Sequence, residues 1–371
     1  MSTVNVIRPA SDGSDTQALL LKMYSGSFTE AFRNQPSLYK SGLGVVKEVS
    51  TAGGGKSWQF IMRAEGPSAE EFSPGDEMLG QEAAHTEGTI TCDNYLVKHN
   101  YVGIDEIQQS QFDVTSSVGS DHSRLLKMEA DKRIFIQLGL AARGVAVTSH
   151  NSLTVHNGGN VVTRSGGSTT VSTAFSTAYP LSPIGAANLR ADLRALAYQM
   201  LLDNIPPENR YLWLHPWGWQ VLLHDSGSII GTPANTIVPV GSTLFNNSDY
   251  GSPNDINNQK ITIVEGFKVV GVPNATSNGG SMPDQDFTTS TLPTKYQYSF
   301  KPASTTGTPI AIAAVQGPAG TAPVGMVEFE GITQEVSWHP ERLSWLFATR
   351  TRCGFGVMHP YCAGSVEVLS T

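Results

Sequence analysis

Apolar residues recur at helical spacing through residues 120–143 and predict the longest helix of the chain. Ser120 is placed to cap the start of this helix, and Gly144 is placed to end it. One face is apolar and consists of Leu125, Met128, Phe135, Leu138 and Ala142. Most charged residues fall off that face, namely Arg124, Lys127, Asp131, Lys132 and Arg133. We therefore expect the apolar stripe to pack into a protein core.

A second helix is predicted to begin at Pro183, in the segment "SPIGAANLRADLRALAYQMLLDN". Ser182 can accept a hydrogen bond from the first turn, where proline is favoured because its missing amide hydrogen would have no partner. Its apolar residues share one face, made of Leu189, Leu193, Leu196 and Met200. A shorter amphipathic pattern in residues 16–32 predicts another helix.

Strand-like segments surround these helices. A glycine-rich turn at residues 53–55 joins two of them, and residues 211–214 form a short buried strand before a helix that opens at Pro216. Residues 261–274 read as strand, glycine, strand, and residues 325–371 as strands alternating with turns. Loops or exposed ribbons are expected in 148–182, 225–260 and 275–323. This order of elements predicts an α+β fold.

A polar excursion separates two of the predicted strands. Residues 66–80 read "GPSAEEFSPGDEMLG" and lie between the apolar run Trp58–Met62 and the strand-like Gly88–Cys92. The excursion is too long for a tight hairpin turn and too short to fold alone. It therefore predicts an arm that needs another surface to pack against.

The composition narrows the function. The net charge of −8, without a basic tract, argues against binding nucleic acid through its phosphates. Charged residues make up only 15% of the chain, against roughly 25% in soluble domains. The low value fits either a surface largely buried against other chains or a loop-rich protein kept in solution by its hydroxyl groups.

Membrane insertion and disulfide formation are not expected. No apolar run reaches about 18 residues, and the first residues lack the pattern of a signal peptide. The three cysteines, Cys92, Cys353 and Cys362, have no C-x-x-C spacing, which favours reduced thiols in a cytosolic setting.

Sequence motifs for catalysis, nucleotide binding or metal binding are not found. "GGGKS" at Gly53–Ser57 ends like a phosphate-binding loop but lacks the first glycine and a following helix, so a hairpin turn is expected. Cys353 and Cys362 beside His359 are too far apart for a typical metal site and are expected to be buried thiols. One polar and aromatic cluster could serve a hydrolase or a sugar-binding protein, and it comprises Trp213, His215, Trp217, Trp219, His224 and Asp225. The simpler expectation is that His215 ends a strand and helps to cap a helix, so we expect no catalytic residue, cofactor or metal.

The order of these parts resembles the major capsid proteins of tailed phages, most closely those of short-tailed podoviruses of the T-seven type. "ALLLKMYSGSFTEAF" is similar to the family's N-terminal helix, and "GKSWQFIMRAEG" with "EFSPGDEMLG" is similar to its extended loop. "HTEGTITCDNYL" with "DEIQQSQFDV" resembles the return strand and the lead into a spine helix. "NIPPENRYLWLHPWGWQVLL" and "EGFKVVGVPN" resemble the axial domain, and "GFGVMHPYCAGSVEV" the closing strands, whereas residues 148–180 and 275–323 match nothing.

The resemblance implies the Hong Kong 97 phage-type fold with five parts. These are an N-terminal arm and short helix (1–45), an extended loop formed by a β-hairpin arm (46–98), a peripheral domain with the spine helix at about 120–143 and a loop insertion (99–181), an axial domain (182–335), and closing strands of the peripheral domain (336–371).

The resemblance also implies contacts between copies of the chain. The extended loop would lie over a neighbouring subunit, and its acidic side chains would pair with basic ones on the neighbour's spine helix. The residues expected at this contact are Glu70, Glu71, Phe72, Pro74, Gly75, Asp76 and Glu77 on the loop, and Arg124, Lys127, Lys132 and Arg133 on the helix.

By the same resemblance, the chain would form hexamers and pentamers of an icosahedral phage head around double-stranded DNA, without sequence-specific binding. A scaffolding protein and a portal would take part in assembly, a decoration protein is an optional partner, and a covalent lysine–asparagine crosslink is not expected. The protein would be found in the virion, and in the host cytoplasm during assembly. Two alternatives remain open at this point: an encapsulin-like nanocompartment shell protein, and a hydrolase or carbohydrate-binding protein that uses the Trp213–Trp219 cluster.

Overall fold

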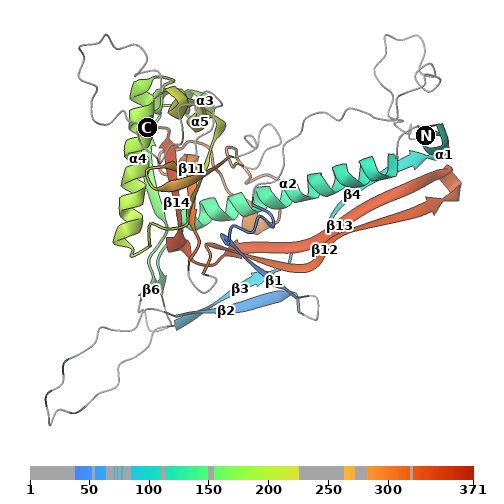
Figure 1. Cartoon of the computed structure of the whole chain (residues 1–371), viewed down its shortest axis with the longest axis horizontal. Coiled ribbons are helices and arrows are strands. Elements are labelled where there is room, and N and C mark those ends of the chain that lie inside the picture. The colour runs from blue at the N-terminus through green and yellow to red at the C-terminus, as the bar shows by residue number, and fades with distance from the viewer. Residues whose placement is uncertain are drawn as a thin grey trace.

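Two sheets and one long helix organise the chain (Figure 1). The helix α2 (Val114–Ala142) runs from one sheet to the far end of the other. In Figure 1 the six-stranded sheet and its helices lie at the left, and the long strands of the second sheet extend to the right beside α2. The computed structural model describes residues 38–51, 55–63, 71, 73, 77, 85–109, 114–148, 154–224, 263–271, 282–317 and 321–371.

The six-stranded sheet is buried on both faces. Its strands lie in the order β7 (Asn160–Ser165), β14 (Ala363–Leu369), β11 (Thr308–Val315), β8 (Arg210–Leu214), β10 (Phe267–Gly271) and β9 (Ile263–Val264). One face is covered by α3 (Val171–Ala178), α4 (Pro183–Leu202) and α5 (Pro216–His224). The C-terminal half of α2 packs on the other face, where Phe135 meets Trp213 edge to face. Alternate residues of β8 and β11 therefore enter two different cores.

The second sheet is a long ribbon that follows α2. Its four strands lie in the order β1 (Val46–Ser50), β12 (Val324–His339), β13 (Ser344–Val357) and β4 (Leu96–Gly103). β12 and β13 form an antiparallel hairpin, β4 pairs with β13, and β1 lies parallel to β12. The short helix α1 (Ile104–Gln109) follows β4.

Two further pairs of strands stand apart from these sheets: β2 (Ser57–Arg63) with β3 (His85–Thr91), and β5 (Val147–Thr148) with β6 (Thr154–His156). Among the described residues, no helix is long and apolar enough to cross a membrane.

The helices predicted in residues 120–143, from Pro183 and from Pro216 are present, the first with a change of boundary. In α4, the Ser182 hydroxyl accepts a hydrogen bond from the Gly185 amide at 3.4 Å, as the sequence predicts. The predicted apolar face of α4 is fully buried. The helix α2 begins at Val114, so the expected cap at Ser120 is wrong. The preceding turn is already helical, and the Ser120 hydroxyl donates back to the Ser117 carbonyl at 3.0 Å.

The long helix is more deeply buried than one stripe would require. Met128, Phe135, Leu138 and Ala142 are buried as expected, and Leu125 is half-buried. Neighbouring residues off the stripe, such as Ile134 and Ile136, are also buried. Even Asp131 is buried, because its carboxylate accepts the amide hydrogens of Leu38 and Tyr39 at 2.7 and 3.0 Å.

The strands follow the expected order but not every expected pairing. β1 and β2 do not pair with each other, so the segment ending at Ser57 links two sheets and is not a hairpin turn. Of the closing region 336–371, β13 joins the second sheet, whereas β14 enters the six-stranded sheet between β7 and β11. The elements α3 and β11 lie in segments expected to be loop or ribbon. The helix expected in 16–32 lies outside the described residues.

Candidate functional site: a two-stranded arm and its anchor

The strands β2 and β3 form a two-stranded arm with one covered face. Over the described residues, β2 pairs only with β3. Trp58, Phe60 and Ile90 point to the covered face and pack against Val327. The opposite face is solvent-exposed, and Ile61 there has 77% of its surface exposed. A two-stranded ribbon is marginally stable by itself, so the exposed face is a candidate contact surface.

A glycine shapes the covered face of the arm. Phe60 and Gly88 are opposite each other on β2 and β3. A Cβ atom added to Gly88 would overlap the Phe60 ring, so the ring lies across the strand only because glycine leaves the space. The ring also stacks against Trp58, with 5.1 Å between ring centroids.

Glycines also form the seat on which the arm rests. Gly325 and Gly356 are opposite each other on β12 and β13, and a Cβ added to either would lie 2.6 or 2.9 Å from an Ile90 methyl or methylene carbon. At Gly354, an added Cβ would overlap the carbonyl oxygen of Thr91. These glycines let the backbone of β3 cross the second sheet at a distance that any side chain would prevent.

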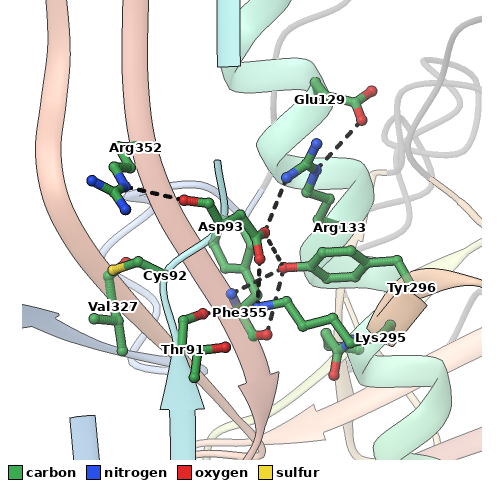
Figure 2. A network of polar contacts seen from close by, with 11 residues as sticks. Thr91, Cys92, Asp93, Glu129, Arg133, Lys295, Tyr296, Val327, Arg352 and Phe355 are labelled. Carbon is green, nitrogen blue, oxygen red and sulfur yellow. Dashed lines mark hydrogen bonds and ion pairs between the residues drawn. The ribbon is translucent and has the colours of Figure 1, made fainter. Parts of the chain in front are cut away.

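A buried polar network fixes the end of the arm, and Asp93 is its centre (Figure 2). The Asp93 carboxylate accepts a hydrogen bond from Arg133 of α2 at 3.0 Å and one from the Tyr296 hydroxyl at 2.7 Å. The Lys295 ammonium lies 2.7 Å from the same carboxylate and also donates to the Thr91 carbonyl at 2.9 Å. One side chain therefore ties the arm to α2 and to residues 294–296.

The backbone of Asp93 continues the network into β13. Its amide donates to the Cys353 carbonyl at 3.2 Å, and its carbonyl accepts from Arg352 at 3.1 Å. The Tyr296 hydroxyl also accepts the Phe355 amide hydrogen at 3.1 Å. Burial, and then the neighbouring Asp93 charge, raise the pKa of Tyr296 well above its usual value, so the phenol keeps its proton and remains a donor. The direction of the arm is thus set by three segments that are distant from it in sequence: α2, residues 294–296 and β13.

The acidic residues expected at the subunit contact lie beyond this arm. Glu71 and Glu77 are exposed. The other predicted loop residues, Glu70, Phe72, Pro74, Gly75 and Asp76, lie outside the described residues.

The four basic residues expected on α2 have different surroundings. Lys127 is exposed, Arg124 lies 3.1 Å from Asp121, and Lys132 lies 3.7 Å from Glu129. Arg133 is different because its side chain is only 7% exposed and pairs with Asp93 inside the same chain. We therefore remove Arg133 from the residues available to a neighbour and assign it to the anchor.

Three members of the tryptophan cluster, Trp213, His215 and Trp217, have structural roles. Trp213 is fully buried, and the Trp217 indole donates to the Tyr179 carbonyl at 3.0 Å. His215 accepts the Trp217 amide hydrogen at 3.1 Å, as expected of a residue that caps α5. Its other ring nitrogen lies 3.8 Å from the Asp284 carboxylate.

The cysteines are buried thiols, and no group of three metal-binding side chains is found in the described part of the chain. Burial raises the pKa of Cys353 and of Cys362 to about 12, so both remain protonated near neutral pH. Asp225, the remaining member of the tryptophan cluster, lies outside the described residues.

The fold defines the class of protein. A spine helix between a long peripheral sheet and a helix-covered sheet, with a two-stranded arm, is the Hong Kong 97-type fold of phage capsid proteins. The capsid structure of the cyanophage P-SCSP1u is similar at a TM-score of 0.68 and 21% identity, covering 97% of this chain and 96% of that chain. The mature capsid of bacteriophage PhiM1 gives 0.66 and 15%, with coverage of 94% and 91%. The capsid of a native GTA particle gives 0.53 and 11%, with coverage of 98% and 100%.

The sequence itself identifies the family. A family model described as Gp10A-like major capsid protein matches residues 59–367. The chain belongs to this family of major capsid proteins, which are structural proteins and not enzymes. No curated protein matches the chain.

The fold and the family decide between the functions left open by the sequence. The chain is a phage major capsid protein that assembles into a capsid shell and is located in the virion. The alternative of a hydrolase or a carbohydrate-binding protein is set aside, and the histidine and tryptophans that suggested it hold α5 and the core in place. The Asp93 anchor was not foreseen, because its members are far apart in sequence and no motif links them.

Proposed function

We propose that this chain forms hexamers and pentamers of an icosahedral head that encloses double-stranded DNA, as in short-tailed podoviruses of the T-seven type. The observation that supports the proposal is the two-stranded arm, whose outer face is exposed and whose base is fixed. An arm with a fixed direction can reach across to a neighbouring copy, which would cover its outer face, including the exposed Ile61 side chain. A contact of this kind joins different surfaces of identical copies and closes into a ring.

In this proposal the excursion at residues 66–80 lies over the neighbouring subunit. Its acidic residues, of which Glu71 and Glu77 are exposed, meet the basic side of the neighbour's α2 at Arg124, Lys127 and Lys132. Exposed ion pairs contribute little individually, so their role is to set the register between subunits and to choose the partner.

Other partners follow from the proposed head. A scaffolding protein and a portal direct assembly in the host cytoplasm, and a decoration protein can bind the finished shell. The net charge of −8 suits a container that encloses DNA without binding its sequence.

Deletion of residues 67–79 tests the proposal, because it removes the loop and retains both strands of the arm. We expect a folded subunit that forms no closed shells, as seen by negative-stain electron microscopy of the chain produced alone and with a scaffolding protein. The matched control replaces the same thirteen positions, 67–79, by a glycine–serine linker of equal length, and it should also fail if the loop side chains make the contact. Normal particles from the deletion variant would refute the role of the loop.

A charge exchange tests the proposed pairing directly. Lys127→Glu should reduce particle yield, and combining it with Glu77→Lys should restore part of the yield if these exposed groups face each other between subunits. If the single and double variants lose particle yield equally, Lys127 and Glu77 do not pair between subunits.

A further inference from the structure

One stripe on the outer face of α4 is apolar from the first turn of the helix to the last, although no part of the described chain covers it. Ile184, Tyr198 and Leu202 have 70%, 61% and 63% of their surfaces exposed. Three alanines, Ala187, Ala191 and Ala195, are exposed between them. These six residues recur at intervals of three or four, so they form one stripe, which we call the α4 stripe. In Figure 1, α4 is the leftmost of the labelled elements, on the side away from the long strands of the second sheet.

The charged side chains of α4 form ion pairs and hydrogen bonds with other residues of the same chain, so they do not indicate a charged partner. Arg190 and Arg194 both bind the carboxylate of Glu265, at 3.1 Å from each. On the inner side, Asp192 accepts two hydrogen bonds from Arg164 and one from the Tyr179 hydroxyl. An exposed helix normally carries charged side chains on its outer face, so an uncharged stripe of this length indicates a covered surface.

The size of the α4 stripe limits what can cover it. From Ile184 to Leu202 the helix rises about 27 Å, and with a width of about 10 Å the footprint is roughly 270 Å². A stable interface between free proteins buries about 800 Å² on each partner. The stripe therefore suits a partner that other contacts already hold in place, which is the situation of neighbouring copies in a shell.

The shape of the stripe also favours a closely packed protein surface. The three alanines in its middle allow a neighbouring backbone or side chain to approach the helix axis, and the larger residues at its ends frame that space. From these observations we propose that the α4 stripe is an interface with a second copy of this chain, packed beside it in the same ring of subunits. The proposal rests on the ring assembly proposed above and assigns a second contact to it, separate from the arm.

A single cysteine at the middle of the stripe tests this proposal. Ala195→Cys places a reactive thiol at an exposed position, and the native cysteines Cys92, Cys353 and Cys362 are buried. We expect a maleimide to label the variant rapidly in unassembled subunits and at least tenfold more slowly in particles made of this chain and its scaffolding protein. Equal labelling in subunits and particles overturns the proposal. Protection that begins only when a decoration protein is added also overturns it, because the occupant is then not a second copy.

A substitution at the same site gives an independent measurement. Ala195→Glu introduces a charge into the stripe at little cost to the helix, so the subunit should keep its helical circular dichroism while sedimenting particles fall at least tenfold. Ala195→Ser is the matched control, since it adds a small polar group without charge, and it should assemble normally. Normal assembly of Ala195→Glu would overturn the proposal. If the unaltered chain forms no particles, the proposed ring assembly is refuted. If it forms particles and Ala195→Glu forms them equally well, only the proposed α4 interface is refuted.

Discussion

Replacing Asp93 by alanine should destabilise the subunit far more than the loss of a surface charge. The Asp93 side chain is 5% exposed, and its carboxylate contacts Arg133, Lys295 and Tyr296. Lys295 is partly exposed and can be rehydrated, but the Arg133 side chain is 7% exposed. The variant would remove the buried partner of Arg133 and leave it the partly exposed carboxylate of Glu129 at 3.5 Å. Removing one partner of a buried pair costs about 3–5 kcal/mol.

Urea unfolding of the unassembled subunit measures this loss. With a urea dependence of about 3 kcal/mol per molar, the midpoint should fall by about 1 M or more. The charge-neutral Asp93→Asn should be less damaging, because it keeps the shape of the side chain and can still accept hydrogen bonds. The control is Glu335→Ala, which removes a carboxylate that is 66% exposed and lies 3.3 Å from Arg350, and it should leave the midpoint unchanged.

A double variant separates the stranded charge from the lost hydrogen bonds. Arg133→Met in the Asp93→Ala background removes the guanidinium that has lost its buried partner, and it should recover part of the fall in the urea midpoint. A loss below about 1 kcal/mol in Asp93→Ala, the usual value of an exposed pair, would refute the anchor. The anchor would also be refuted if Arg133→Met lowers the stability of Asp93→Ala by as much as it lowers the stability of the unaltered chain.

Three further predictions follow from the surroundings of single residues. Gly354→Ala should disrupt the crossing of β3 over β13 and lower both stability and particle yield, whereas Gly331→Ala, where an added Cβ has room, should be tolerated in both assays. The thiols of Cys353 and Cys362, whose pKa values burial raises to about 12, should react with Ellman's reagent at pH 8 about a thousandfold more slowly than in urea-unfolded chain. Burial, and then the charge of Lys98 on β4, lower the pKa of His122, so the unfolded chain binds a proton at this histidine more tightly than the folded chain does. The folded state should therefore lose stability as the pH falls below about 6.5. His122→Gln should show a smaller fall in the urea midpoint between pH 7.5 and 5.5 than the unaltered chain.

The parts of the fold that could be predicted are those with a local physical cause. The helix α4 carries its own start signal, Ser182 and Pro183, and an apolar period that matches its buried face. The strand β8 and the helix α5 follow from an apolar run that ends at Pro216. The order of these parts carried the resemblance to phage capsid proteins, which the family match confirms.

The parts that could not be predicted depend on pairings between distant segments. The strand β11 is buried along its whole length, so it shows no alternation of apolar and polar residues, and it has a proline near its start. Its neighbours β8 and β14 lie on opposite sides of it in sequence. Arg133 looked like a surface residue, because nothing in its local pattern shows that Asp93 lies beside it. The glycine seat of the arm is equally hidden, since its purpose depends on where β3 crosses.

The position of β14 has a consequence for the synthesis of the protein. This strand comes late in the chain, yet it lies inside the sheet between β7 and β11. In the finished sheet, β14 pairs with one edge of β7 and one edge of β11. While the ribosome is still making residues 316–362, these two edges lack the strand that pairs with them. The core beneath the axial helices can therefore close only after Ala363–Leu369 has emerged. A nascent subunit therefore cannot complete the six-stranded sheet before residues 363–369 have been made.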